Sequence, residues 1–501
     1  MGRSLLLLLL PCLVAADDGD AILRALEARV ARAIKEAGPS VVSVRVSRSE
    51  RYRKAAHWGV PADPDAPGKL DRFDQAAARK AVPDDAPGRD RILKSIAAHD
   101  LSDPDHVPEG YGSGFVVDKS GLVLTAAHVV KDAAKVYVRI AGKGGSWADI
   151  HAADPRSDLA VLKLLDPPEG LSALAMGDGG AVRKGQFLVS LSAGFAPGFR
   201  ADAEPEAGWG IVSALRQQIP PPAGYDERQL GKLSLHHYGT LIQTSASVTP
   251  GCSGGVLLDL DGKAVGLANA LARVSGEGKG GFAIPLDPST QRIIGVLKRG
   301  EEVEYGFLGV VISQRGFGAR RGLSIERVAA GSPAALGGMK DDDVILTVAG
   351  QPIRKNSDLF LHIGMGLAGG TVKVEVERRG RPVALDVKLA KFFVEGPVIA
   401  SKRPPARFGL RVDWSSTLSQ RNPFARFDRA TGPGVVVREV VPGSPADKAS
   451  LQADKFITRV NGTAVPTPAD FYAEIARAGG KAELTVLNSE GRPTTVALEG
   501  K

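Results

Sequence analysis

The sequence predicts a mainly β protein with several domains, and three features of the 501-residue chain support this prediction. Glycine (60 residues) and proline (33 residues) are abundant, which favours short strands and turns over long helices. Short apolar runs separated by turn residues extend from Gly112 to Ala270, and a repeated pattern follows Glu301. A chain of this length has room for roughly three domains.

Residues 1–16 indicate a secretory signal peptide. Arg3 supplies a positive charge, Leu5–Leu10 begins an apolar run, and Val14-Ala15-Ala16 is a small-residue cleavage site. The run is shorter than the roughly 20 residues that span a bilayer, although an uncleaved anchor is the alternative. We therefore expect a periplasmic or otherwise secreted protein without a stable membrane span. Once the peptide is removed, Cys252 is the only cysteine, so no intrachain disulfide is expected.

An amphipathic helix is expected over 20–37, followed by a first strand over 40–46. The apolar residues of this helix recur at every fourth position, and they are Ile22, Leu26, Val30 and Ile34. Residues 47–110 form a long polar insertion, in which short helices are expected near 69–81 and 89–98. Insertions of this length are often functional loops, but the residues of this one indicate no chemistry.

From Gly112 onward, apolar runs alternate with turns, which is typical of a β-barrel or a β-sandwich. The expected strands cover 114–118, 122–125, 136–138, 158–164, 186–191, 210–215, 241–244, 256–258 and 264–270.

The stretch Val248–Leu258 has the features of a loop that carries a nucleophile. Pro250 and Gly251 force a tight turn, Ser253 lies at its tip, and further glycines follow. Small residues allow a substrate to approach and allow backbone N–H groups to converge on one point. Acyl transfer needs these features, because its tetrahedral intermediate carries a negative oxygen. Taken alone, the stretch is more typical of an ordinary turn between strands.

His128, Asp158 and Ser253 follow one another in a chain order that is known for catalytic triads. In a triad the hydroxyl attacks a carbonyl carbon, the imidazole takes the proton, and the carboxylate holds the imidazole and stabilises its cation. Taken singly, His128 is more typical of a core histidine and Asp158 of a turn cap. The order and context of all three residues favour catalysis.

Two segments after Glu301 repeat one plan, which predicts two further domains of similar fold. Each segment contains Gly-Ser-Pro-Ala, at 331–334 and at 443–446, followed by a strand-like run at a similar distance. The first copy is expected over 301–392 and the second over 406–501. Residues 393–405, with the proline-rich 401–406 at their end, are expected to be the linker.

The charge pattern excludes a nucleic-acid partner. The formal net charge is +8, but basic and acidic residues are interspersed, and the densest basic cluster is only Arg51–Lys54. His236-His237 is interpreted as a pair of surface loop residues, because further metal ligands are not found nearby in the sequence. We expect neither a cofactor nor a metal.

The chain resembles the HtrA/DegP serine proteases, which are trypsin-like enzymes with C-terminal PDZ domains. The strings that carry the resemblance are Leu124–Val130, Asp158–Lys163, Gly210–Ala214, Gln243-Thr244, Pro250–Gly255 and Gly281–Pro285. The resemblance implies a chymotrypsin/trypsin-like double six-stranded β-barrel over 17–300, which contains the 47–110 insertion. It also implies that the two repeats are PDZ domains.

The resemblance further implies roles for individual residues. The backbone N–H groups of Gly251 and Ser253 are expected to form the oxyanion hole, and Val248, Ala268 and Ala270 to line the S1 pocket. Because these pocket residues are small or apolar, cleavage is expected after small or medium aliphatic residues. The loops expected to bind C-terminal carboxylates contain Phe307, Leu308, Gly309 and Val310 in the first repeat and Phe408, Gly409 and Leu410 in the second. A second repeat without any ligand is the alternative.

Three residues depart from the family pattern: Cys252 replaces the usual Asn, Ser245 the usual Asp and Val256 the usual Pro. Cys252 is expected to be a partly buried, unreactive thiol. The leading hypothesis is an ATP-independent endopeptidase that degrades misfolded or damaged envelope proteins, and the resemblance implies a homotrimer or a multiple of one. The alternatives are a chaperone or peptide-binding protein with a latent protease site, and a PDZ scaffold.

Overall fold

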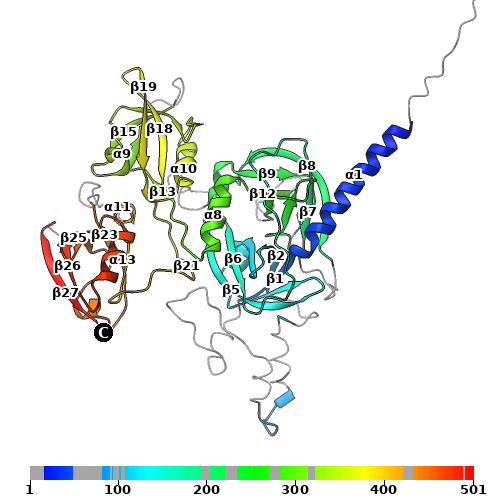
Figure 1. Ribbon diagram of the computed structural model, residues 1–501, viewed down its shortest axis with the longest axis horizontal. Helices are drawn as coiled ribbons and strands as arrows, with labels where there is room; N and C mark the ends of the chain where they lie inside the picture. Colours follow the sequence, from blue (N-terminus) through cyan, green and yellow to red (C-terminus); the bar gives the residue numbers. More distant parts are fainter. Residues whose placement is uncertain are drawn as a thin grey trace, which may run out of the picture.

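The computed structural model confirms the mainly β fold class (Figure 1). It describes residues 16–48, 82–90, 93, 101–102, 108–194, 204–219, 234–249, 251–270, 281–313, 322–421, 433–488 and 491–500. The expected signal peptide lies outside these residues except for Ala16, as does the helix expected near 69–81. Of the helix expected near 89–98, residues 89, 90 and 93 are described, and they are helical.

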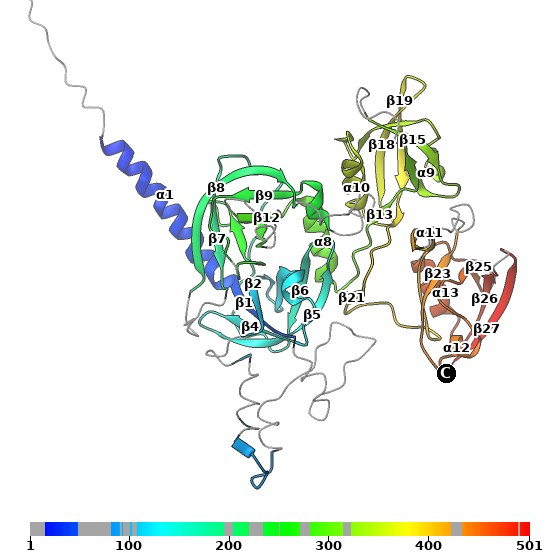
Figure 2. The same ribbon diagram turned by 180° about the vertical axis from the view of Figure 1, so that it is seen from behind.

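The helix expected over 20–37 is α1 (Ala16–Ala37), and its C-terminal part lies against the second barrel, where it contacts β7 (Phe187–Ser192) and Arg29 Nη2 pairs with Asp261 Oδ1. Ala33 and Ala37 are buried, whereas Ile22 is 69% exposed. Its N-terminal part points away from the barrels in both views (Figures 1 and 2). None of the described helices is long and apolar enough to cross a membrane.

Within the described residues, six strands close the first barrel in the order β5-β4-β1-β2-β3-β6, because β5 also pairs with β6. β21, from much later in the chain, adds to the outer edge of β5: Ile399 pairs with Ala153, and Ala400 with Ala152. Every residue of β1 is buried, which fits a barrel strand whose outer face is covered by neighbouring segments. The elements are η1 (Gly38–Ser40), β1 (Val41–Ser47), β2 (Gly110–Asp118), β3 (Leu122–Ala126), α5 (Ala127–Val130), β4 (Lys135–Ile140), β5 (Gly144–Asp154), β6 (Leu159–Leu164) and β21 (Ile399–Ala400).

The second barrel closes in the order β10-β11-β12-β9-β8-β7 within the same described part of the chain. Its small core contains Leu188, Val212 and Leu257, which are fully buried. The elements are β7 (Phe187–Ser192), β8 (Glu206–Gln217), η2 (Leu235–Tyr238), β9 (Leu241–Thr244), β10 (Val256–Leu258), β11 (Ala264–Ala268) and β12 (Gly281–Pro285).

Helix α8 (Pro288–Lys298) leads from the second barrel to the repeats. Asp287 caps it by accepting a hydrogen bond from the backbone N–H of Thr290 at 2.7 Å, and Pro288 occupies the first helical position. Both views place α8 between the barrels and the repeats (Figures 1 and 2).

The two repeats have the same strand order in their sheets. The first runs β14-β15-β16-β18-β19 and the second β22-β23-β24-β26-β27, so β14 and β22 each lie at an edge of the sheet as described. The elements of the first are β13 (Gly306–Phe307), β14 (Val310–Ile312), β15 (Leu323–Val328), α9 (Pro333–Leu336), β16 (Val344–Val348), β17 (Gln351–Pro352), α10 (Asn356–Gly364), β18 (Thr371–Arg378), β19 (Arg381–Lys388) and β20 (Ala390–Lys391). Those of the second are β22 (Leu410–Trp414), α11 (Ser416–Arg421), β23 (Val435–Val440), α12 (Pro445–Lys448), β24 (Phe456–Val460), β25 (Thr463–Ala464), α13 (Pro468–Arg477), β26 (Lys481–Leu487) and β27 (Pro493–Glu499).

A buried cluster of charges joins the second repeat to the ends of the first. Lys391 Nζ, on a side chain that is 4% exposed, lies 2.8 Å from Glu302 Oε1, 3.0 Å from Asp413 Oδ1 and 3.3 Å from Glu304 Oε1. Trp414 Nε1 donates a hydrogen bond to Glu304 Oε2 at 3.0 Å. Burial raises the pKa of Glu304, although the charge of Lys391 opposes this shift.

Candidate active site

The carboxylate of Asp158 holds both the backbone and the ring of His128. His128 lies in α5, a single turn that follows β3, and Asp158 directly precedes β6. The backbone N–H of His128 donates to Asp158 Oδ1 at 2.9 Å, and ring Nδ1 lies 2.7 Å from Oδ2. Because the carboxylate accepts the proton on Nδ1, the other ring nitrogen, Nε2, carries a lone pair that can take a proton.

Asp158 itself occupies a tight, buried turn. Its φ of 57° is in the left-handed region, and the residue is 6% exposed. The turn is held by Asp154, whose Oδ2 accepts hydrogen bonds from the backbone N–H of Ser157 at 3.0 Å and from the Tyr305 hydroxyl. Burial alone would raise the pKa of the Asp158 carboxyl, but hydrogen bonding to His128 holds that pKa well below its ordinary value.

Two neighbours of Asp158 were missed by the sequence reasoning. Asn269 Nδ2 donates to Asp158 Oδ2 at 2.9 Å, and His236 Nε2 lies 3.8 Å from the same oxygen. The interpretation of His236 as a surface loop residue is wrong, because η2 buries its side chain to 5% exposure. His237 is half-buried and its Nδ1 lies 2.9 Å from the carbonyl oxygen of Ile219.

The loop of Ser253 is held against the first barrel by backbone contacts. The Ser253 carbonyl accepts from the N–H of Ser113 at 2.8 Å, and the Ser113 hydroxyl donates to the Gly251 carbonyl at 2.9 Å. Gly251 (φ 92°) and Gly254 (φ 87°) both adopt the left-handed conformation, and a side chain at 254 would collide with the backbone of Ser113. These two glycines are therefore required by the shape of the loop.

The end of β11 connects Ser253 to Asp158. Asn269 contacts the carboxylate, and the backbone N–H of the next residue, Ala270, donates to Ser253 Oγ at 3.0 Å. Among the hydrogen bonds of the described residues, none joins Ser253 Oγ to the ring of His128. The hydroxyl is thus turned toward Ala270 in this structure.

The backbone donors expected at the site are those of Gly251 and Ser253. Within the part of the chain that the structure describes, neither N–H group donates a hydrogen bond to another residue. Both N–H groups can therefore serve an oxygen of a bound substrate.

The residues expected to line the S1 pocket lie together. Val248 and Ala268 form a small apolar cluster with Cys252, and Ala270 packs against it. Cys252 is 5% exposed, and its Sγ lies 3.0 Å from Ser192 Oγ and 3.2 Å from Thr249 Oγ1. The thiol is therefore engaged with neighbouring hydroxyl groups, and it is more deeply buried than expected.

The two expected carboxylate-binding loops have matching geometry. In the first repeat, the carbonyls of Leu308 and Gly309 accept from the N–H groups of Ala334 and Ala329, at 2.9 and 3.0 Å. The φ of Gly309 is 82°. The carbonyl groups of the loop are thereby directed into the domain.

The second repeat reproduces these contacts. The carbonyls of Phe408 and Gly409 accept from the N–H groups of Ala446 and Val441, at 3.0 and 2.9 Å, and the φ of Gly409 is also 82°. The loops thus correspond residue by residue, with Leu308 matching Phe408, and Val310 matching Leu410.

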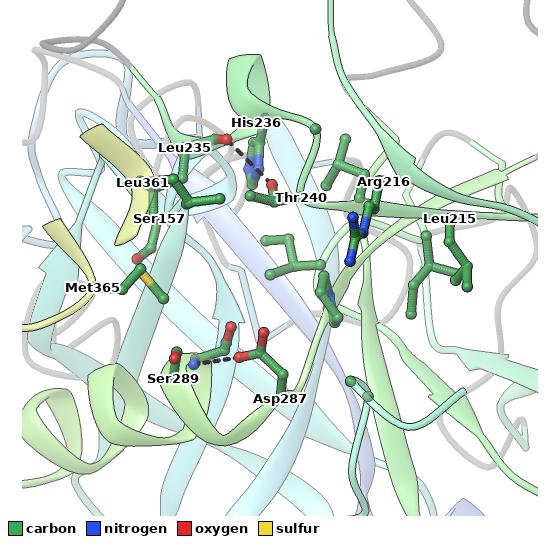
Figure 3. A pocket seen from close by; sticks show the side chains of 18 of the residues that line it. Ser157, Leu215, Arg216, Leu235, His236, Thr240, Asp287, Ser289, Leu361 and Met365 are labelled. Carbon is green, nitrogen blue, oxygen red and sulfur yellow. Dashed lines mark hydrogen bonds between the residues drawn. The ribbon is translucent and has the colours of Figure 1, made fainter. Parts of the chain in front are cut away.

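A cavity of about 440 Å³ lies where the second barrel, η2 and α10 meet (Figure 3). Its wall includes His236 and Thr240, Leu361 and His362 of α10, and Met365, which directly follows α10. His236 therefore lies between this cavity and Asp158.

Three family models match the chain. A trypsin-like peptidase domain matches residues 112–267, and PDZ domains match residues 306–389 and 436–488.

The chain is also similar to curated proteins and solved structures. A probable periplasmic serine endoprotease DegP-like of Ectopseudomonas mendocina is 30% identical over 462 residues, covering 89% of this chain and 87% of the relative. One of Pseudomonas fluorescens is 32% identical over 385 residues, covering 74% of each. A solved HtrA-type protease, AlgW with a decapeptide, is 23% identical with a TM-score of 0.44, covering 75% of this chain and 99% of that one.

Proposed function

Because the chain belongs to the family of DegP-like periplasmic serine endoproteases, we propose that it degrades misfolded or damaged envelope proteins with His128, Asp158 and Ser253 as its catalytic triad. This membership confirms the resemblance predicted from the sequence. The chain is a serine endopeptidase with a trypsin-like peptidase domain and two PDZ domains. The observation that carries the triad is the 2.7 Å contact between His128 Nδ1 and Asp158 Oδ2.

In the proposed reaction, Ser253 Oγ attacks the carbonyl carbon of the scissile peptide bond and its proton passes to His128 Nε2. In this structure Oγ accepts from the N–H of Ala270 and has no hydrogen bond to the ring of His128 among the described contacts, so the two groups have to approach each other before attack. The buried Asp158 carboxylate stabilises the imidazolium that forms. His128 then delivers the proton to the leaving amine, and water hydrolyses the acyl-enzyme by the same route in reverse.

The oxyanion of the tetrahedral intermediate is stabilised by the N–H groups of Gly251 and Ser253. A single donor of this kind lowers the activation free energy by about 3–4 kcal/mol in related enzymes. The side chain before the scissile bond enters the apolar cluster of Val248, Ala268 and Ala270, which carries no charge that would select Lys or Arg.

Substrates are recruited by their exposed C-termini. The N–H groups of residues 308–310 capture the carboxylate, and the peptide adds as a strand to the open edge of β14. The leader at residues 1–16 directs the chain across the inner membrane and is removed. The protease domains assemble into a trimer or a multiple of one.

Hydrolysis of an unfolded protein, with the new ends identified by mass spectrometry, tests the proposal. Ser253→Ala is expected to lower the rate by about 10⁴-fold or more. Wild-type protein that is no more active than Ser253→Ala contradicts it.

A second function, peptide binding or chaperone activity with a latent protease site, is favoured by the hydrogen bond that turns Ser253 toward Ala270. In that case the wild type and Ser253→Ala are both inactive as proteases, yet both suppress aggregation of an unfolded substrate to the same extent. The same pair of proteins thus separates the two functions.

A further inference from the structure

Three nitrogen atoms surround one oxygen of Asp158. Oδ2 lies 2.7 Å from His128 Nδ1, 2.9 Å from Asn269 Nδ2 and 3.8 Å from His236 Nε2. The triad of the proposed mechanism uses the first of these contacts and leaves the other two without a role.

The amide of Asn269 links the carboxylate to the second histidine. Its nitrogen carries two hydrogen atoms; one is donated to Asp158 Oδ2, and the other points to His236 Nε2 at 3.3 Å. His236 can accept this bond only as the neutral ring with its proton on Nδ1. If the Asn269 amide were turned over, its Oδ1 would face Asp158 Oδ2 and the lone pair of His236 Nε2. All three atoms are acceptors, so no hydrogen bond could form.

The surroundings leave these groups little freedom. Asn269 is fully buried and His236 is 4% exposed. Helix η2 is fixed to the turn before Asp158, because the N–H of Leu235 donates to the carbonyl of Arg156 at 2.8 Å. A buried polar group that loses its partner is costly, so each of these residues restricts the other.

We propose that His236 and Asn269 are positioning residues for the catalytic aspartate. The lone pair of His236 sets the orientation of the Asn269 amide, and the amide fixes the direction in which Asp158 Oδ2 faces His128. The inference rests on the triad proposed above. Neither residue touches the substrate, so their effect is exerted through Asp158 and His128.

The test compares His236→Gln with His236→Leu in the full-length protein. Gln retains an acceptor oxygen for the Asn269 amide, whereas Leu has similar bulk and no acceptor. His236→Leu is expected to lower kcat by about 10- to 100-fold, because the freed Asn269 amide no longer holds its hydrogen bond to the charged Asp158 carboxylate in place, with KM within about 2-fold. His236→Gln is expected to recover most of kcat. Equal kcat for wild type and His236→Leu, or equal losses in both variants, overturns the proposal.

A second measurement does not depend on turnover. The proton between His128 Nδ1 and Asp158 gives a downfield ¹H NMR resonance, which can be recorded in the Ser253→Ala background. We expect His236→Leu to shift or broaden this resonance and His236→Gln to retain it. An unchanged resonance in His236→Leu overturns the proposal whether or not the protein is an active protease, so the two failures are distinguishable. Melting temperatures of both variants show whether they are folded.

Discussion

The backbone N–H of Val412 donates a hydrogen bond to the hydroxyl of Tyr472 at 3.2 Å. Val412 lies on the open edge of β22, two residues after the loop proposed to bind carboxylates in the second repeat, and Tyr472 lies on α13. A peptide that added to β22 would need this N–H for its own backbone carbonyl. Tyr472 therefore occupies a position that a ligand would use.

Among its described residues, the first repeat shows no such contact. The buried pair Leu359 and Ile363 of α10 corresponds to Phe471 and Ile475 of α13, so Tyr472 corresponds to Phe360. Phenylalanine has no oxygen that could accept a backbone hydrogen bond. The two repeats thus differ by one hydroxyl at the place where a peptide would pair.

Replacing Tyr472 with Phe is expected to strengthen peptide binding to the second repeat by up to about 10-fold, since the N–H of Val412 is released. The measurement is fluorescence anisotropy of a labelled peptide with an apolar C-terminus, in Ser253→Ala protein. The protein also carries Gly309→Val, so that only the second repeat is measured. This substitution removes binding by the first repeat, because a side chain at this left-handed position meets Ser332. Adding Gly409→Val should abolish the gain, and unchanged affinity in Tyr472→Phe contradicts the prediction.

Cys252→Ala is expected to retain activity within about 3-fold of wild type, because alanine conserves the apolar packing and the thiol contributes only weak hydrogen bonds. The adjacent Ser253→Ala is the matched control for loss of activity. The measurement is the rate at which each variant and the wild type hydrolyse a peptide with an aliphatic residue before the scissile bond. A loss in Cys252→Ala as large as that in Ser253→Ala would contradict the prediction.

Peptides with Val before the scissile bond are expected to be cleaved at least about 10-fold faster than those with Arg. Burying an arginine among Val248, Ala268 and Ala270 would leave its charge without a partner. Comparison of kcat/KM for matched fluorogenic peptides checks this. A preference for Arg would show that another part of the chain supplies an acidic group to the pocket.

Lys391→Met is expected to destabilise the docked second repeat by up to about 3–5 kcal/mol, because three carboxylates lose their most buried cation and keep only Arg438, which contacts Asp413 and Glu302. Urea unfolding measures the loss. The control is Lys481→Met, which removes the pair with Glu499 at 2.7 Å; both of its side chains are at least 70% exposed. No measurable change is expected in the control, and equal effects in the two variants contradict the prediction.

Acidification is expected to weaken the attachment of the segment after β21. Burial lowers the pKa of His151 from its usual 6.5, and nearby Lys163 and Lys402 add to this, while the Lys298 carbonyl opposes it. The neutral ring accepts from the Ser401 hydroxyl at 2.8 Å through Nδ1. The neutral ring of His151 therefore contributes its full stabilisation above pH 6.5, and this contribution is lost as the pH falls through the lower pKa of the folded state.

The melting temperature of wild type should therefore fall more between pH 7.5 and 5 than that of His151→Gln, which has no titrating group there. Other ionisable groups contribute equally to both proteins. If the melting temperatures of the two proteins fall equally with pH, the prediction for His151 is contradicted.

The sequence was sufficient for residues that lie in recognisable local patterns. His128, Asp158 and Ser253 each follow or precede an apolar strand with a characteristic string, and the Gly-Ser-Pro-Ala strings revealed the repeats. Asn269 and His236 lack such a signal, because a single polar residue acquires its neighbours only through the closure of the barrel. Strand β21 is two residues long and shows no alternation, so a linker was the natural expectation. The exposure of Ile22 was also unforeseen, since an apolar stripe does not specify how far its partner surface extends.

The pairing of β21 with β5 limits how far the second repeat can travel. Nine residues, 401–409, connect β21 to β22, and fully extended they reach at most about 30 Å. Even if the charged contacts around Lys391 were released, the start of β22 would stay within that distance of β21 on the first barrel of its own chain. A peptide bound to this repeat would therefore be kept near the barrels of its own chain.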